Sequence, residues 1–407
     1  MRHIVLKSLI TLSLLTLTTW LVVHNRMRRV IFHEDYVYNM AEIKTFRHFP
    51  EALYHIGLKL WFDNDVPGAE QFFRQAVDQN MFYMDAWFKL AQAEIARGNS
   101  NAALAILRFS DELPKNVFRW KWDQLLLAQE LGAKKTFIKG INFLVKNGEK
   151  LQDAFQLFDG FTDKNSRLAI QELDTVNLRS YLEWLMRWGR AEDAWIAWQK
   201  IHEKGVHNKD IRLEYINFLV NLKQIERAVQ VRKTGHENVD GMTNAGFEHE
   251  ITNRGFDWRY TPDQKDKWTI RRSMTSAADG AYCLKLRFEG KENIAFGHLY
   301  QIVPVVPNVQ YLLTYKWRSR DLTTDQGPFV DIYGYGCDGL YTKGPMILGT
   351  HAWRKQGIEF EAPNGCHAVV VRLYRQPSKR FDNKIAGRLW LDDFGLEKRK
   401  PLISEKK

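Results

Sequence analysis

Residues 52–114 match themselves when the sequence is shifted by 34 positions, and each copy reads as two helices joined by a short polar turn. Small residues recur at equivalent places, Gly57 with Ala91 and Ala69 with Ala103, where two helices must approach closely. One hairpin of this length cannot bury its apolar face alone, so neighbouring hairpins have to stack. The repeat therefore predicts an α-solenoid.

The same period returns further along the chain. Residues 190–195 match residues 224–229, and both segments have the pattern of the start of a second helix. Between residues 116 and 160 the helical periodicity continues in a poor register, which indicates a degenerate repeat. We expect a solenoid of five or six hairpins over residues 50–232.

The repeat resembles the tetratricopeptide repeat family. The resemblance rests on the two small-residue positions just described and on Pro114, which closes the second unit. Asn80 stands where the first unit would carry its closing proline. The resemblance implies a solenoid whose surface binds partner proteins.

An apolar run of residues 4–23 precedes the repeats. Its length is just enough to cross a hydrocarbon core of about 30 Å, and Trp20 lies near one end, where an interfacial aromatic residue belongs. A cleaved signal peptide is the alternative, but bulky and basic residues follow the run in place of a small-residue cleavage site. We expect an uncleaved membrane anchor at residues 1–29 and a connector at 30–49. Basic residues flank both ends of the run, so they do not orient it.

The chain of 407 residues has a formal net charge of +11, yet it contains no long Lys/Arg run with interleaved aromatic residues. We interpret the charge as a solvated surface and expect no nucleic-acid partner. The cysteines are Cys283, Cys337 and Cys366, and their spacing does not suit zinc. At most one disulfide can form, and cysteine usage leaves the cellular compartment open.

The composition changes at residues 233–243, where glycine, asparagine and aspartate predict a linker. After the linker, apolar and polar residues alternate, most clearly at 282–288, 310–317, 329–333, 369–373 and 389–394. Short alternating segments separated by turn residues predict an antiparallel β-sandwich over residues 244–400, followed by a tail at 401–407. The expected fold class is a multidomain α + β protein.

Three phrases within this region follow one another in order: N-A-G-F-E at 244–248, D-G-A-Y-C-L-K-L at 279–286 and L-W-L-D-D-F-G-L at 389–396. This order resembles that of jelly-roll carbohydrate-binding modules and their galactose-binding-like relatives. The resemblance implies a jelly roll, and a structural calcium ion held by Glu248 and Asp392, with Asp279 a weaker candidate. The alternative is that these carboxylates only cap strand ends by accepting backbone amides.

Glycan-binding modules stack flat aromatic rings on the C–H surfaces of sugars. The β-region is rich in aromatic residues, and the candidates for such stacking are Trp258, Tyr260, Trp268, Tyr333, Tyr335 and Trp353. The sequence does not separate rings that bind a ligand from rings that fill the core.

The sequence contains no G-x-S-x-G motif, glycine-rich phosphate loop or H-E-x-x-H motif, so we expect no enzymatic activity and no cofactor beyond the calcium ion. The first hypothesis is a single-pass scaffold of the bacterial inner membrane, mostly periplasmic, that assists exopolysaccharide or O-antigen assembly or export through protein contacts of its solenoid. The alternatives are a glycan-binding protein that uses the sandwich to hold a polysaccharide, and a glycan-active enzyme with an unusual site.

Overall fold

The computed structural model describes residues 2–31, 40–112, 118–235, 241–261, 267–381 and 383–399. Pro114, the tail 401–407 and parts of the expected connector 30–49 and linker 233–243 lie outside these residues. The chain divides into two compact units, Met1–Arg187 with Glu192–Lys200, and Trp188–Ala191 with Ile201–Lys407.

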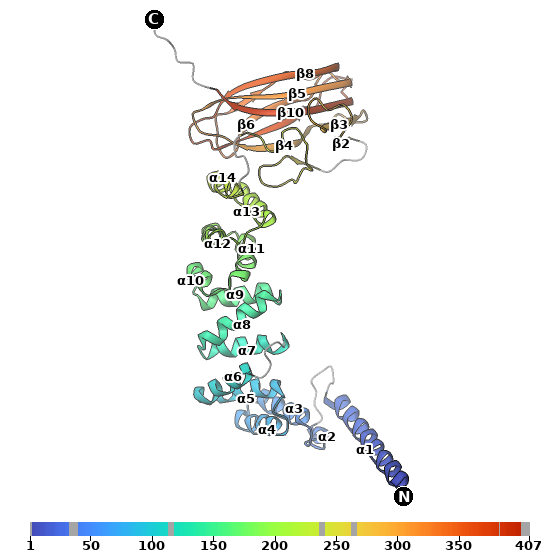
Figure 1. Cartoon of the computed structure of the whole chain (residues 1–407), viewed down its shortest axis with the longest axis vertical. Helices are drawn as coiled ribbons and strands as arrows, with labels where there is room; N and C mark the ends of the chain where they lie inside the picture. Colours follow the sequence, from blue (N-terminus) through green and yellow to red (C-terminus); the bar gives the residue numbers. More distant parts are fainter. Residues whose placement is uncertain are drawn as a thin grey trace. The chain divides into compact units, whose positions relative to one another are not determined.

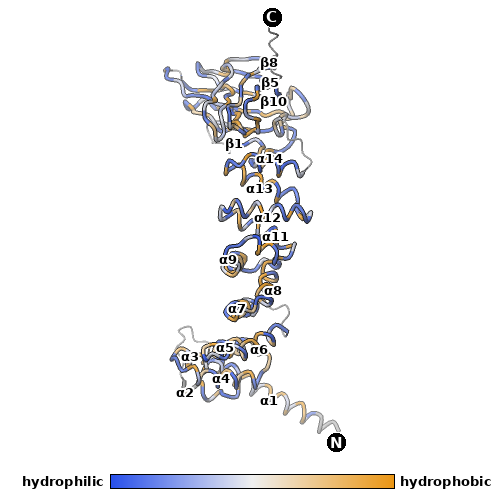
Figure 2. Tube along the Cα trace, turned by 90° about the vertical axis from the view of Figure 1, so that its left-hand side faces the viewer, coloured by the Kyte–Doolittle hydropathy of each residue, from blue (hydrophilic) through white to orange (hydrophobic). Residues whose placement is uncertain are grey.

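The described residues between Arg2 and Lys233 form helices joined by short turns (Figure 1). Its helices are α1 (Arg2–Ile31), α2 (Met40–Lys44), α3 (Pro50–Phe62), α4 (Val66–Gln79), α5 (Met84–Ala96), α6 (Ser100–Glu112), α7 (Phe118–Glu130), α8 (Lys134–Lys146), α9 (Leu151–Phe161), α10 (Ser166–Glu172), η1 (Thr175–Asn177), α11 (Leu178–Arg187), α12 (Ala191–Glu203), α13 (Lys209–Asn221) and α14 (Ile225–Lys233). Hydrophobic and hydrophilic residues alternate along these helices, as expected for helices that bury one side (Figure 2). The last two helices belong to the second unit.

Helix α1 is long and apolar enough between Lys7 and Ile31 to cross a membrane, a property that a signal sequence shares. Its apolar side chains from Leu9 to Val23 are exposed, whereas Met27 and Ile31 are buried. The N-terminal part of the helix therefore offers an apolar surface that the rest of the described chain does not cover.

The 34-residue spacing is regular through three hairpins. The first helix of each begins at Pro50, Met84 and Phe118, and the second helices begin 16 residues later in each case, the third of them at Lys134. The helices of the third hairpin therefore begin at the same spacing as those of the first two, although the sequence indicated a poor register there.

Compensating side-chain sizes explain this regularity. A Cβ atom on Gly57 of α3 would lie 2.6 Å from the ring of Phe73 in α4, so the large ring requires glycine opposite it. One period later the smaller Leu107 follows, and the position of Gly57 is occupied by Ala91. In the third hairpin the same position is Leu125, and Gly140 makes room for it, because a Cβ there would lie 3.0 Å from the Leu125 Cδ1 atom.

We expect Gly57→Ala to destabilise the first hairpin by about 1–2 kcal/mol, because the overpacking cost exceeds the helix-propensity gain of about 1 kcal/mol. The double variant Gly57→Ala with Phe73→Leu restores the pairing used one period later and should regain most of that loss. Hydrogen exchange of the α3 and α4 amides in the full chain measures both effects. Additive losses in the double variant would contradict this packing argument.

The second unit contains a β-sandwich. Its strands are β1 (Arg259–Tyr260), β2 (Trp268–Ser273), β3 (Cys283–Glu289), β4 (Phe296–Pro304), β5 (Gln310–Thr323), β6 (Phe329–Gly334), β7 (Tyr341–Lys343), β8 (Gly349–Glu361), β9 (Ala368–Arg375) and β10 (Ala386–Lys398). They form two five-stranded sheets with the orders β1-β4-β9-β6-β7 and β2-β3-β10-β5-β8, and the paired strands are antiparallel. The predicted sandwich is confirmed, and the five predicted strands are β3, β5, β6, β9 and β10.

One hydrophobic core joins the two sheets. Leu286 of β3 and Leu391 of β10 pack in it with Ile332 of β6 and Val371 of β9. The side chains that alternate with Ile332 and Val371 therefore lie on the opposite, outward face of the sheet β1-β4-β9-β6-β7.

A disulfide links Cys337 to Cys366 and closes a loop with a sequence separation of 29, and Cys283 is free and buried. The bridge joins the segment after β6 to the segment before β9. It therefore fastens two strands that are already neighbours in the same sheet.

Candidate ligand-binding face

Tyrosines collect on the outward face of the sheet β1-β4-β9-β6-β7. Tyr300 of β4 lies directly opposite Arg372 of β9, and Tyr333 of β6 lies opposite Tyr341 of β7. Tyr374 follows Arg372 on the same face of β9, two residues further on. We call these four tyrosines with Arg372 the tyrosine face.

The rings of this face are partly open to solvent. Tyr341 is 58% exposed, while Tyr300, Tyr333 and Tyr374 are half-buried. Burial is the main cause that raises the pKa of Tyr333 and of Tyr341. Both hydroxyls therefore stay protonated at neutral pH and can donate as well as accept a hydrogen bond.

Arg372 is fixed at the centre of the tyrosine face. Its Nε and Nη2 atoms donate to the two carboxylate oxygens of Asp331, at 3.1 and 2.6 Å, and Asp331 is completely buried. The guanidinium carbon lies 4.9 Å from the ring centroid of Tyr333 and 4.2 Å from that of Tyr374. Burial alone would lower the pKa of Arg372, but the paired carboxylate raises it above its usual value. The cation is therefore held in one orientation by two rings and one carboxylate.

This arrangement suits a flat, partly apolar ligand with polar edges. Aromatic rings offer a large contact area at low conformational cost, and phenolic hydroxyls supply polar contacts at the rim of each ring. The ion pair with Asp331 holds the Arg372 guanidinium against the rings of Tyr333 and Tyr374. It leaves Asp331 bound to Arg372, so this carboxylate is not available as a general acid or base.

Two of the predicted stacking residues lie in the core. Trp258 and Trp268 are 1% and 2% exposed. Trp258 packs on Phe394 with ring centroids 4.8 Å apart, and Trp268 stacks on His298 at 4.4 Å. Neither ring has a face open to a ligand, so the prediction of stacking is wrong for both.

The other four predicted residues are dispersed. Tyr260 packs against the core, and the hydroxyl of Tyr335 donates to the carbonyl of Val220 in α13 at 3.0 Å. The indole Nε1 of Trp353, on β8 of the other sheet, donates to the Ser276 carbonyl at 3.1 Å. Only Tyr333 of the six candidates belongs to the tyrosine face.

The stacking residues expected from the sequence do not include Tyr300, Tyr341, Tyr374 or Arg372. The signal that would have found two of them is the alternation of β9, where Arg372 and Tyr374 are out of phase with the apolar residues at 369, 371 and 373. Their meeting with Tyr300 and Tyr341 depends on the strand order, which alternation does not predict.

Glu248, Asp279 and Asp392 meet around one loop. One oxygen of Asp392 accepts the amides of Ala278 and Asp279, at 2.7 and 3.2 Å, and Asp392 is completely buried. Glu248 Oε1 accepts the amides of the two residues after Gly280, at 3.0 and 3.1 Å. The carboxylates thus tie loop 278–282 to the sandwich.

These contacts account for both carboxylates without an ion. Within the described ranges, no group of three or more His, Cys, Asp or Glu side chains is placed to hold a metal. Calcium takes six to eight oxygen ligands, so an ion at this place would need backbone carbonyls or water besides these side chains. The contacts that the structure shows are those of the amide-capping alternative.

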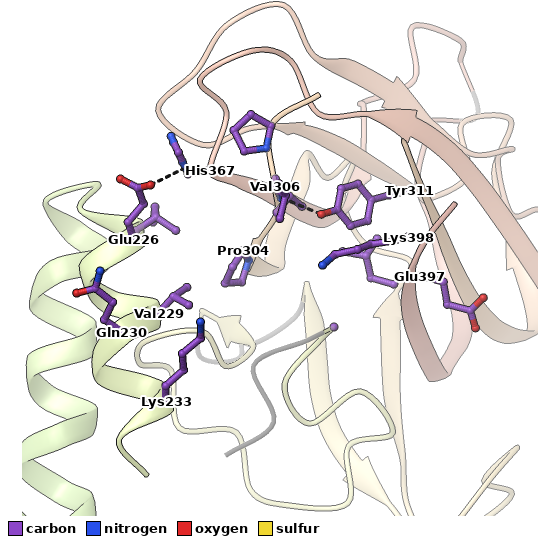
Figure 3. Close-up of a pocket in the computed structure, with 15 residues that line it drawn as sticks. Glu226, Val229, Gln230, Lys233, Pro304, Val306, Tyr311, His367, Glu397 and Lys398 are labelled. Carbon is purple, nitrogen blue, oxygen red and sulfur yellow. Dashed lines mark hydrogen bonds and ion pairs between the residues drawn. The ribbon is translucent and has the colours of Figure 1, made fainter. Parts of the chain in front are cut away.

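A cavity of about 820 Å³ lies beside α14, within the unit that contains the sandwich (Figure 3). Side chains of both signs line it, including Glu226 and Lys233 of α14 and Glu397 and Lys398 of β10. The Glu226 carboxylate lies 3.6 Å from Nδ1 of His367. The mixed charges favour no one class of ligand, and the cavity adjoins the linker, part of which lies outside the described residues.

No family model and no curated protein matches this sequence. Solved structures that align with part of it include the carbohydrate-binding module TmCBM61 in complex with β-1,4-galactotriose, with 15% identity, a TM-score of 0.28, and 40% of this chain and 99% of that chain covered. A family 16 carbohydrate-binding module aligns with 18% identity, a TM-score of 0.28, and 39% and 99% covered. A cyclase from Fischerella sp. TAU aligns with 16% identity, a TM-score of 0.28, and 39% and 95% covered. Likenesses at this level do not assign a function.

Proposed function

We propose that the β-sandwich binds a carbohydrate on the tyrosine face. The observation that carries this proposal is the set of four partly exposed tyrosines arranged around one fixed arginine. Sugar rings present C–H surfaces that stack on aromatic rings, and hydroxyl groups that pair with phenols and a guanidinium. The sheet holds these groups before a ligand arrives, so binding need not order them.

A glycan array of neutral and acidic polysaccharides, probed with the full chain in detergent, tests this proposal. We expect Tyr341→Ala and Tyr374→Ala each to weaken binding of the retained glycan roughly tenfold or more, which corresponds to about 1.4 kcal/mol per tenfold. Tyr341 is exposed and takes part in no core packing, so its removal should leave thermal unfolding unchanged.

Trp353→Ala is the matched control, because it removes a large aromatic ring from the other sheet. It should leave glycan binding unaltered. Loss of binding in Trp353→Ala with normal binding in Tyr341→Ala would place the site elsewhere, and absence of binding by the folded chain to every glycan would refute the proposal.

We further propose that the chain is anchored in a bacterial inner membrane by α1, with the sandwich on the periplasmic side. The disulfide between Cys337 and Cys366 supports this orientation, because such bonds persist in oxidising compartments and are rare in the cytosol. The regular 34-residue hairpins support a tetratricopeptide-like scaffold that holds partner proteins. A role in assisting exopolysaccharide or O-antigen assembly or export would use both the glycan-binding sandwich and the hairpins that bind partner proteins.

The proposed role is binding and not catalysis. Asp331 is paired with Arg372, and Glu359 lies 3.2 Å from Arg399. The buried pairing of Asp331 leaves it unsuited to act as one of the two cooperating carboxylic acids that glycoside hydrolysis commonly requires, whereas the Glu359 pair is a solvent-exposed surface contact.

A further inference from the structure

The anchor helix is continuous with the core of the first hairpin. Its last turns place Met27 and Ile31 in a buried cluster with residues of α2, of α3 and of the turn between them: Ile43, Phe46, Ala52 and Ile56. Val23, the last exposed apolar residue of the run, is only four positions before Met27, a rise of about 6 Å. The exposed apolar segment of α1 is therefore followed directly by the part of the same helix that packs on the first hairpin.

Phe49, which precedes α3, lies beside the apolar segment itself. It lines a small cavity together with Leu15, Thr16, Thr19, Trp20 and Val23. His24 stacks on Trp20 with ring centroids 4.9 Å apart and lies 6.0 Å from the Phe49 ring. The start of α3 thus lies at the level of the helix where an interfacial tryptophan is found.

More exposed apolar side chains lie at this same end of the hairpin. The Gln79 side chain at the end of α4 donates to the Arg47 carbonyl at 3.2 Å, which ties the two segments together. Met81 and Phe82 follow in the next turn and are 50% and 63% exposed. Lys44 and Arg47 are exposed on the segment before α3.

We propose that this interfacial patch, made of Lys44, Arg47, Phe49, Met81 and Phe82, binds the headgroup layer of a phospholipid bilayer. The apolar side chains enter the interface, and the two cations contact lipid phosphates. The proposal rests on α1 spanning the membrane, as proposed above. In this arrangement the first hairpin lies on the membrane surface and is not separated from the anchor by a flexible linker.

Spin labels on the full chain in vesicles of phosphatidylcholine and phosphatidylglycerol test the proposal. A nitroxide is placed at Phe82→Cys, at Phe62→Cys or at Leu15→Cys, and its collisions with oxygen and with a water-soluble nickel complex are compared. Phe62 is the matched control: it is 71% exposed and lies at the far end of α3, about 18 Å from Pro50. The native Cys283 does not interfere, because burial raises the pKa of its thiol to about 11.

We expect the label at position 82 to favour oxygen over the nickel complex several-fold more than the label at 62. Equal ratios at 82 and 62, with a lipid-exposed label at 15, would overturn the surface contact while leaving the anchor intact. A water-exposed label at 15 would overturn both.

A charge reversal tests the role of the cations. Lys44→Glu with Arg47→Glu should lower the oxygen preference at position 82 several-fold, whereas reversal of the exposed Lys135 and Lys146 on α8 should not. An equal effect of both pairs would overturn the assignment of Lys44 and Arg47 to lipid phosphates.

Discussion

Asp392→Ala should lower the free energy of unfolding of the sandwich by about 3 kcal/mol. The substitution removes the carboxylate that accepts the amides of Ala278 and Asp279, and hydrogen bonds to a charged group contribute about 1.5–3 kcal/mol each. Relief of the desolvated carboxylate offsets part of this cost. Hydrogen exchange of β3 and β10 during urea unfolding of the full chain reports the change in the sandwich alone.

Asp392→Asn is the matched control, because its carbonyl oxygen still accepts the two amides. It should cost about 1 kcal/mol, since its NH₂ group meets the Asp393 amide, which donates to Asp392 Oδ1 in the native chain. Both losses should be the same in calcium and in a chelator. A wild-type chain that chelation destabilises as much as Asp392→Ala does would instead establish the calcium site.

The same residue gives a pH dependence with a defined sign. Burial is the main cause that raises the pKa of Asp392 in the folded chain above its unfolded value. As the pH falls, Asp392 is therefore protonated at a higher pH in the folded state than in the unfolded state. The contribution of this group to stability is lost as the pH rises through the folded pKa. The stability of the wild type relative to Asp392→Asn should accordingly increase as the pH falls through that window, and a decrease would contradict the assignment.

Local patterns predicted the helical region and five of the strands that the structure describes, β3, β5, β6, β9 and β10. The alternating segments became strands because one of their faces is buried, and the amide-capping role of Glu248 and Asp392 was one of two alternatives that the ordered phrases allowed. The third hairpin was predicted only as a degenerate repeat, because Leu125 and Phe137 replace the small residues of the first two copies. The regular packing of this hairpin depends on Gly140, which leaves room for the larger Leu125. This relation between the two residues can be recognised only when the contact between α7 and α8 is known.

The candidate site was harder to predict because it is assembled across strands. Tyr300, Tyr333 and Tyr374 lie on β4, β6 and β9, which are neighbours only through the order of the sheet. The prediction for Trp258 was wrong for a different reason, which is the path of a loop and not the order of the strands. Trp258 lies outside the strands, where a ligand-binding ring is plausible, but the loop folds inward and closes one end of the core over Phe394.

Removal of the disulfide, by Cys337→Ser with Cys366→Ser, should have the largest effect on the sandwich. The bond closes a loop with a sequence separation of 29, and the chain-entropy model gives about 3.5 kcal/mol for a loop of that size. Because the chain-entropy model places this effect in the unfolded state, the loss should appear in the amides of both sheets that exchange only when the whole sandwich unfolds.

The free cysteine supplies the control for this prediction. Cys283→Ser replaces a buried thiol that forms no disulfide, so its effect should be smaller and should not change when a reductant is added. The wild type in reductant should instead approach the stability of the double serine variant. This comparison also tests the proposed compartment: a chain whose stability depends on the bridge by about 3.5 kcal/mol, a large part of a typical domain's total, is poorly suited to the reducing cytosol. A double serine variant as stable as the wild type would remove the main support for the periplasmic orientation.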